Sequence, residues 1–309
     1  MDINLWNKYG LDTMPESMQI KYWQGIDSEK KYQECINKKI VPPYSRSDIL
    51  YQYDVHGFRY GDTGSSSPHL LTKPLVLVSG CSFTEGIGLP ENHIWHSFLL
   101  DKINKPTSKL NLGKGGRSIA AIVRHIYVSI DTYSIRPDFV YLLLPPVYRM
   151  ELILKDNDNI SICNFMAHMA STWEKKERYE EVNPEFKQII THGTNQNWYH
   201  QAFLQLLFLQ MFLELKNIPW YFSFWNNGFD KTQMTEMLGD DNSTIPESLT
   251  KHYIGGVINY EKEIPPNEQR YTQQTARDLV HPGPNYHYLL AEQLYARLLT
   301  KPDFRRFIL

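Results

Sequence analysis

The chain has 309 residues, of which 42% are hydrophobic and 21% charged, and its formal net charge at pH 7 is −2. This length suits one large α/β domain or two small ones, and the nearly neutral charge argues against binding to nucleic acid or a membrane surface. No apolar stretch reaches the about 18 residues of a membrane-spanning helix, and no secretory signal is visible at the amino terminus. The three cysteines (Cys35, Cys81 and Cys163) are scattered. They favour a reduced, cytoplasmic setting.

The first seventy residues have mixed periodicity and contain no catalytic constellation. We expect residues 1–70 to form an extension that packs on or near the main domain of residues 71–309. The piece Tyr53 to Arg59 predicts a turn around Gly57. Gly61 to Ser67 has the composition of a flexible linker, which places the division at about residue 70.

The segment Leu75 to Gly86, LVLVSGCSFTEG, predicts a buried strand followed by a sharp turn. Its first four residues are continuously apolar, which is typical of a strand covered on both faces of a parallel sheet. Gly80 permits the turn, and Ser82 follows it. Ligands of open α/β sheets bind outside the carboxyl ends of the strands, so Ser82 is predicted to lie at a binding edge.

A serine nucleophile needs a base, and the base needs a group that orients it. Asp278 and His281 offer both within one short segment, DLVHPG. An aspartate three residues before a histidine on a turn can accept a hydrogen bond from the imidazole Nδ1, which leaves Nε2 to take a proton from serine. The pattern predicts a catalytic triad of Ser82, His281 and Asp278.

The two blocks GCSFTEG and DLVHPG, in this order, resemble those of the SGNH (GDSL-type) hydrolases. The resemblance extends from about Leu75 to Leu299 and implies a three-layer α/β/α sandwich with a parallel, flavodoxin-like sheet of about five strands. It implies neither a cofactor nor a metal. Cys81 stands where the family usually has aspartate. Cys81 is a weaker candidate for the nucleophile, because its side chain should alternate away from that of Ser82.

The segment Asn111 to Ser118, NLGKGGRS, resembles the second block of the same family. Aligned in this way, Gly116 supplies a backbone N–H that holds the oxyanion together with the N–H of Ser82. A glycine suits this role because the backbone must approach the substrate closely. The alternative is a loop that needs a positive φ before the helix predicted from Ser118 to Ser129.

The third predicted strand, Phe139 to Leu144, is followed by Pro-Pro-Val-Tyr-Arg, where the family carries Gly-x-Asn-Asp. The asparagine that would be a further oxyanion donor is absent, and losing one such donor typically costs about 3 kcal/mol. Arg149 is the nearest replacement, since its guanidinium carries five donors. Arg149 could equally form a salt bridge with Glu151.

Trp225 and Asn226 follow another predicted strand, Trp220 to Trp225, and would lie at the same edge as Ser82. Asn226 could supply the missing amide donor. Trp225 either stacks on a sugar ring or packs in the core. We treat these two residues and Arg149 as candidate substrate-binding residues.

Residues at about 152–195 fit no simple sheet pattern and predict an insertion over the carboxyl edge of the sheet. The next segment, Trp198 to Lys216, is apolar around most of its circumference, which predicts a helix buried against the sheet. His93 and His96 lie three positions apart, but no third ligand is near them in sequence, so we expect no metal site.

From these observations we expect a serine esterase that cleaves an acyl ester of a small molecule or carbohydrate, with O-acetyl groups on carbohydrate as the first candidate. One alternative is an acyltransferase that uses the same triad. The other is a non-catalytic binding or structural module with an SGNH-like fold. The complete triad favours an enzyme. The sequence leaves the acyl group, the alcohol and the oligomeric state open.

Overall fold

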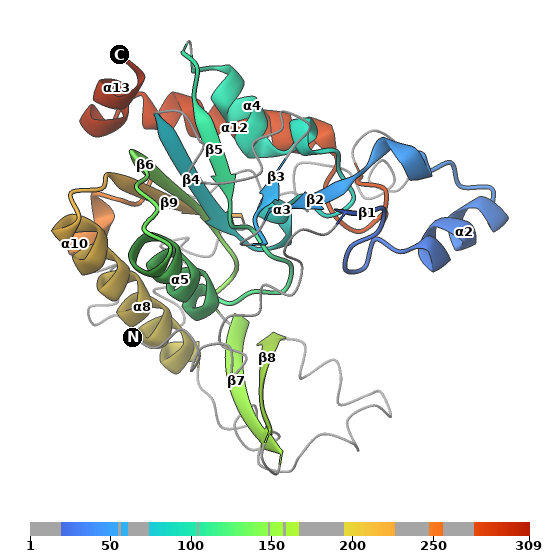
Figure 1. The fold of residues 1–309 in the computed structure, drawn as a ribbon, viewed down its shortest axis with the longest axis horizontal. Coiled ribbons are helices and arrows are strands. Elements are labelled where there is room, and N and C mark those ends of the chain that lie inside the picture. The colour runs from blue at the N-terminus through green and yellow to red at the C-terminus, as the bar shows by residue number, and fades with distance from the viewer. Residues whose placement is uncertain are drawn as a thin grey trace.

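The computed structural model of the protein describes residues 20–54, 57–60, 74–103, 105–147, 149–156, 159–166, 195–225, 247–255 and 275–309. A 7-stranded sheet with the order β1-β2-β3-β5-β4-β6-β9 forms its centre (Figure 1). Four neighbouring strands run parallel to one another: β5 (Ser108–Asn111), β4 (Leu75–Gly80), β6 (Phe139–Leu144) and β9 (Trp220–Phe224). In chain order they are arranged 2-1-3-4, which is the beginning of the flavodoxin-like winding.

Three apolar runs of the sequence form fully buried strands of this sheet. Every residue of β4, β6 and β9 is buried, as expected for parallel strands covered on both faces. Because side chains alternate along a strand, Leu77 packs into the core on one face and Val78 into the core on the other.

Helices cover both faces of the sheet (Figure 1). The helices α5 (Ile119–Tyr127) and α8 (Asn195–Leu215) pack on the face that contains Leu77. The helices α4 (Trp95–Asp101), α12 (Pro284–Leu298) and α13 (Pro302–Ile308) pack on the other. The predicted three-layer α/β/α sandwich is therefore confirmed, with four parallel strands in the described residues.

Local capping signals set the helix starts near the site. The hydroxyl of Ser118 accepts a hydrogen bond from the backbone N–H of Ala121 at 3.1 Å, and α5 begins one residue after Ser118. The helix α12 begins at Pro284, whose fixed φ suits a first helical position. A π-helical turn, Val128–Thr132, continues α5.

Residues 20–60 extend the sheet by three antiparallel strands that the sequence did not reveal. These are β1 (Ile20–Lys21), β2 (Tyr51–Tyr53) and β3 (Arg59–Tyr60). The strand β3 joins β5 through the pair Arg59 and Asn111. The expected turn lies between β2 and β3, with Gly57 at φ 76°. The linker Gly61 to Ser67 and the division at about residue 70 lie outside the described residues and stay predictions.

A separate antiparallel hairpin, β7 (Arg149–Asp156) and β8 (Asn159–Met166), follows β6 and lies apart from the main sheet (Figure 1). The sequence pattern predicted no strand here. Residues 167–194 of the expected insertion lie outside the described part of the chain. The remaining described elements are short: α2 (Glu29–Asn37), η1 (Arg46–Asp48), α3 (Ser82–Glu85), η3 (Glu91–His93) and α10 (Glu247–Thr250).

The prediction that the apolar helix around residues 198–216 is buried against the sheet is confirmed by α8, although the outer side of α8 is exposed. Leu206, Leu209 and Leu213 are buried against the sheet, whereas Met211 is 65% exposed and Leu215 is 80% exposed. Its apolar circumference is wider than the face that the sheet covers. Among the described helices, α8 included, none combines the length and apolar character needed to cross a membrane.

Candidate active site

Ser82 is the first residue of α3, directly after the turn that ends β4. The turn requires Gly80, because a Cβ there would lie 2.4 Å from the carbonyl oxygen of Leu143 and 2.2 Å from Thr84 Oγ1. Gly86 ends α3 at φ 77°, in the left-handed region. The tight strand-to-helix connection leaves Ser82 partly exposed at the carboxyl end of the sheet.

Asp278 and His281 form the pair that the sequence predicted for them. Asp278 Oδ2 accepts a hydrogen bond from His281 Nδ1 at 2.5 Å, while Oδ1 accepts from the backbone N–H groups of Val280 and His281, both at 3.0 Å. Burial alone would raise the pKa of Asp278, but the hydrogen bond and charge of His281, together with the two backbone N–H groups, lower it below its usual value. The turn holds Leu279 at φ 55°, a strained conformation for leucine.

The ring of Phe83 brings the serine and histidine segments together. It lies 5.8 Å from the imidazole of His281 and 4.5 Å from the indole of Trp225, measured between ring centroids. The structure thus brings His281 and Trp225 against the residue that follows Ser82. Within the described residues no hydrogen bond joins the Ser82 hydroxyl to His281, so the serine–histidine step of the triad stays a prediction.

The loop that carries Gly116 passes beside Ser82. A Cβ placed on Gly115 would lie 3.8 Å from the Cβ of Ser82, and one placed on Gly113 would lie 2.3 Å from the backbone nitrogen of Glu85. Gly116 has φ 80° and open space where a side chain would point. Among the hydrogen bonds of the described residues, the backbone N–H groups of Ser82 and Gly116 donate none.

The other predicted site residues are placed differently. Arg149 begins β7 outside the main sheet, is half-buried and donates its backbone N–H to the carbonyl of Pro146 at 3.0 Å. Asn226 lies outside the described residues.

His93, one of the two histidines considered for a metal site, is hydrogen-bonded to the hydroxyl of Tyr44 at 2.8 Å. In the described part of the chain, no group of three or more His, Cys, Asp or Glu residues is arranged to hold a metal ion.

The chain is similar in fold to solved esterases and lipolytic proteins of the G-D-S-L family. Esterase EstA from Pseudoalteromonas sp. is 13% identical with a TM-score of 0.41, over 74% of this chain and 98% of that chain. A lipolytic protein of the G-D-S-L family from Veillonella parvula is 13% identical with a TM-score of 0.36, over 72% of this chain and 96% of that chain. A carbohydrate acetylesterase family member from Sinorhizobium meliloti is 14% identical with a TM-score of 0.36, over 76% of this chain and 98% of that chain.

No family model and no curated protein sequence matches the chain. The similarity to the solved structures concerns the fold and assigns no role to any residue.

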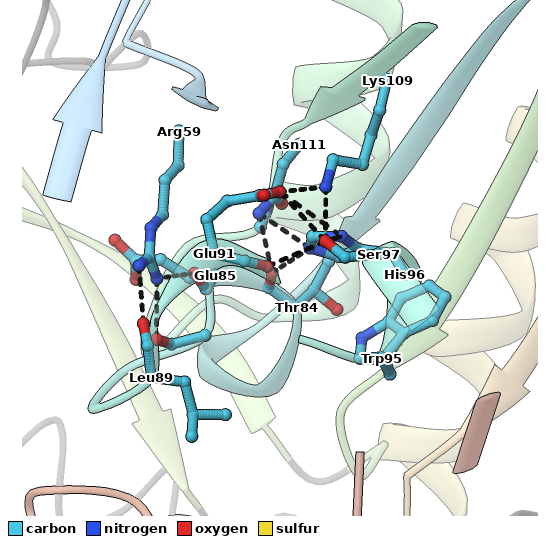
Figure 2. A network of polar contacts seen from close by, with 12 residues as sticks. Arg59, Thr84, Glu85, Leu89, Glu91, Trp95, His96, Ser97, Lys109 and Asn111 are labelled. Carbon is cyan, nitrogen blue, oxygen red and sulfur yellow. Dashed lines mark hydrogen bonds and ion pairs between the residues drawn. The ribbon is translucent and has the colours of Figure 1, made fainter. Parts of the chain in front are cut away.

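The sequence assigned no role to Arg59, a buried arginine that holds the segment after Ser82. The guanidinium of Arg59, 1% exposed, donates to the carbonyls of Glu85 at 2.5 Å, Gly86 at 2.7 Å and Leu89 at 2.7 Å (Figure 2). It thereby satisfies carbonyls at the end of α3 and in the following turn. No local pattern could predict the bonds of Arg59, because its partners lie 26 to 30 positions away.

A second polar cluster supports α3 from the other side (Figure 2). The amide of Asn111 donates to the carbonyl of Thr84 at 2.9 Å, and His96 Nε2 lies 3.1 Å from the same oxygen. Burial lowers the pKa of His96 well below its usual value, and the charge of Lys109 adds to this effect. His96 is therefore neutral and part of the framework of the site.

His287 is a further histidine behind the candidate base. Its Nδ1 accepts the backbone N–H of Trp95 at 3.1 Å, and its ring lies 6.4 Å from that of Phe83. Burial, together with the charge of His281, lowers the pKa of His287 to about 3. His287 is thus a neutral acceptor at neutral pH.

Proposed function

We propose that the protein is a serine esterase in which Ser82 is the nucleophile, His281 the base and Asp278 its orienting group. One observation carries this proposal: a 2.5 Å carboxylate–imidazole contact lies beside Phe83, the residue next to Ser82. Residues from distant parts of the chain meet there at the carboxyl end of a parallel sheet, where α/β proteins bind their ligands. A buried aspartate that fixes the tautomer of a partly exposed histidine is the arrangement that general-base catalysis requires.

In the proposed reaction, Ser82 Oγ attacks the acyl carbon while its proton passes to His281 Nε2. The backbone N–H groups of Ser82 and Gly116 hold the negative oxygen of the tetrahedral intermediate. When the ester bond breaks, His281 returns the proton to the leaving alcohol and the acyl group stays on Ser82. A water molecule, deprotonated by His281, then releases the acid and restores the serine. Asp278 stays ionised throughout, as its lowered pKa favours.

The substrate we propose is a small acyl ester, with acetyl groups on carbohydrate as the first candidate. Trp225 supports this choice, since its half-buried ring lies against Phe83 beside the candidate base. An indole in this place can pack against the apolar face of a sugar ring. Arg149 and Asn226 stay candidates for the donor that replaces the missing asparagine.

Turnover of p-nitrophenyl acetate tests the proposal. We expect Ser82→Ala to reduce kcat at least about 10³-fold, and His281→Ala nearly as much, because members of a triad act as a unit. Ser47→Ala, a change of an exposed serine outside the site, is the matched control and should leave kcat unchanged. Equal turnover by the wild type and Ser82→Ala would refute the esterase and favour a non-catalytic module. Formation of a new ester when an acceptor alcohol is added would instead identify an acyltransferase.

A further inference from the structure

A completely buried carboxylate connects the first sequence block to the loop that passes beside Ser82. The side chain of Glu85 is 0% exposed. Its Oε2 accepts the backbone N–H of Gly115 at 2.5 Å. Its Oε1 accepts the hydroxyl of Tyr53 at 2.8 Å and the side-chain amide of Gln24 at 3.2 Å. The ammonium of Lys114 lies 3.5 Å from the same oxygen.

These contacts join three parts of the chain at one acid. Burying a carboxylate is unfavourable unless hydrogen bonds or a cation compensate for the lost water. Here the compensating groups come from the β-strand extension, through Tyr53 and Gln24, and from the loop itself, through Gly115 and Lys114. The position of the loop is therefore coupled to the position of the extension through Glu85.

The loop end of this connection lies one residue before Gly116. A Cβ on Gly115 would lie 3.2 Å from Glu85 Oε2 and 3.8 Å from the Cβ of Ser82, so the loop backbone fits closely between the acid and the serine. Oxyanion donors act only when they are held within a few tenths of an ångström of the developing charge. A displacement of Gly115 would move the next peptide group, which carries the N–H of Gly116.

We propose that Glu85 is a positioning residue that fixes the oxyanion loop through the N–H of Gly115, and that Tyr53 and Gln24 hold its carboxylate in place. The strands of residues 20–60 thereby contribute to catalysis without touching the substrate. The inference rests on the proposed esterase function and adds to it a role for the amino-terminal extension.

Tyr53→Phe is the sharpest test, because it removes one hydroxyl from a residue that is 2% exposed and preserves its ring. The matched control is Tyr44→Phe, which removes the hydroxyl bonded to His93 at 2.8 Å in the same extension but does not touch Glu85. We expect Tyr53→Phe to lower kcat about tenfold with KM within about twofold of the wild type. Hydrogen–deuterium exchange at residues 111–118 should become faster in Tyr53→Phe and stay unchanged in Tyr44→Phe.

Glu85→Gln provides a conservative second variant. Its amide oxygen can still accept from Gly115 while its NH₂ group donates to the Tyr53 oxygen, so we expect it to retain more activity than Glu85→Ala. If Tyr53 acts through Glu85, adding Tyr53→Phe to Glu85→Ala should lower kcat by less than it does in the wild type. A full tenfold loss in both backgrounds would overturn the proposed connection.

The exchange measurement separates this inference from the proposed function, since it does not depend on turnover. If Ser82→Ala matches the wild type in hydrolysis, the esterase proposal fails, while faster exchange at residues 111–118 in Tyr53→Phe would still establish the connection. If Tyr53→Phe and Tyr44→Phe give the same exchange at these residues and the same kcat, the positioning role of Glu85 is wrong.

Discussion

The two loops that flank Ser82 are both attached to the β-strand extension through a buried acid, but by bonds of different kinds. The loop of residues 275–283 is held by an ion pair in which Arg277 donates Nε and Nη2 to Asp27 at 3.0 and 2.7 Å. The loop of residues 111–118 is held by Glu85, whose closest donors are uncharged.

The ion pair has further support that Glu85 lacks. Arg277 also donates to the carbonyls of Ser45 at 3.0 Å and Arg46 at 3.1 Å, and its guanidinium lies 4.2 Å from the ring centroid of Trp23. Its side chain is 0% exposed and that of Asp27 is 1% exposed. Breaking a satisfied buried ion pair destabilises a fold by about 3–5 kcal/mol, whereas losing one neutral hydrogen bond costs about 1 kcal/mol. The comparison therefore predicts that one attachment governs stability and the other governs turnover.

The largest expected effect is on catalysis at the 275–283 loop itself. Asp278→Asn keeps the shape of the side chain but removes the charge that fixes the tautomer of His281, and we expect kcat to fall about 10⁴-fold. Turnover of p-nitrophenyl acetate measures this, with Asp303→Asn on the distant helix α13 as control. Asp278→Asn with a kcat near that of Asp303→Asn would remove the orienting role from Asp278.

The next largest effect is on the stability of the fold. Arg277→Met leaves Asp27 buried without its cation, and we expect the free energy of unfolding to fall by about 3–5 kcal/mol. Urea denaturation measures the change. Arg306→Met is the control, because Arg306 is 83% exposed and its ion pair with Asp303 should contribute at most about 1 kcal/mol. Similar losses in the two variants would contradict the assignment of stability to the Arg277 attachment.

The sequence predicted the elements that local signals determine, but not the attachments between residues far apart in the chain. The strand Phe139–Leu144 was predicted from its continuous apolar run, and the helix predicted from Ser118 to Ser129 begins one residue later, at Ile119. The two-residue strands of the extension are too short to show a period. The attachments of the site were not predictable from local patterns, because Tyr53 and Glu85 are 32 positions apart and Asp27 and Arg277 are 250 apart.

The pH dependence of stability tests a buried histidine close to the 275–283 loop. This residue is His287, which lies on α12 behind His281, the proposed base. Its folded pKa of about 3 is below the ordinary value of 6.5, so only the unfolded chain binds a proton between these values. Stability is therefore complete above pH 6.5 and falls as the pH drops through this window, by up to about 1.4 kcal/mol per pH unit for one group. Asp278, with a lowered pKa, loses its contribution only at lower pH, below about 4.

His287→Asn tests this assignment, because its side-chain oxygen can accept the Trp95 N–H in place of Nδ1 but does not titrate. We expect the free energy of unfolding of this variant to depend less steeply on pH between 6.5 and 5 than that of the wild type. Buried His96, whose pKa is also lowered, keeps some dependence in both proteins. Equal slopes would exclude His287 as a source of acid sensitivity.

The smallest expected changes in stability compare the attachment through Asp27 with the attachment through Glu85. They come from Tyr51 and Tyr53, the two tyrosines of β2. The hydroxyl of Tyr51 donates to Asp27 at 2.7 Å and accepts the N–H of Gly88 at 2.7 Å, so Tyr51→Phe leaves a buried N–H unpaired and should cost about 1–3 kcal/mol. Tyr53→Phe removes the hydroxyl that donates to Glu85 at 2.8 Å and should cost about 1 kcal/mol. We expect the more stable variant, Tyr53→Phe, to have the lower kcat, because only its hydroxyl acts on the oxyanion loop. Urea denaturation and kcat, measured for both variants, show whether turnover changes independently of stability. A kcat that falls in proportion to stability in both variants would mean that the two loops are held in the same way.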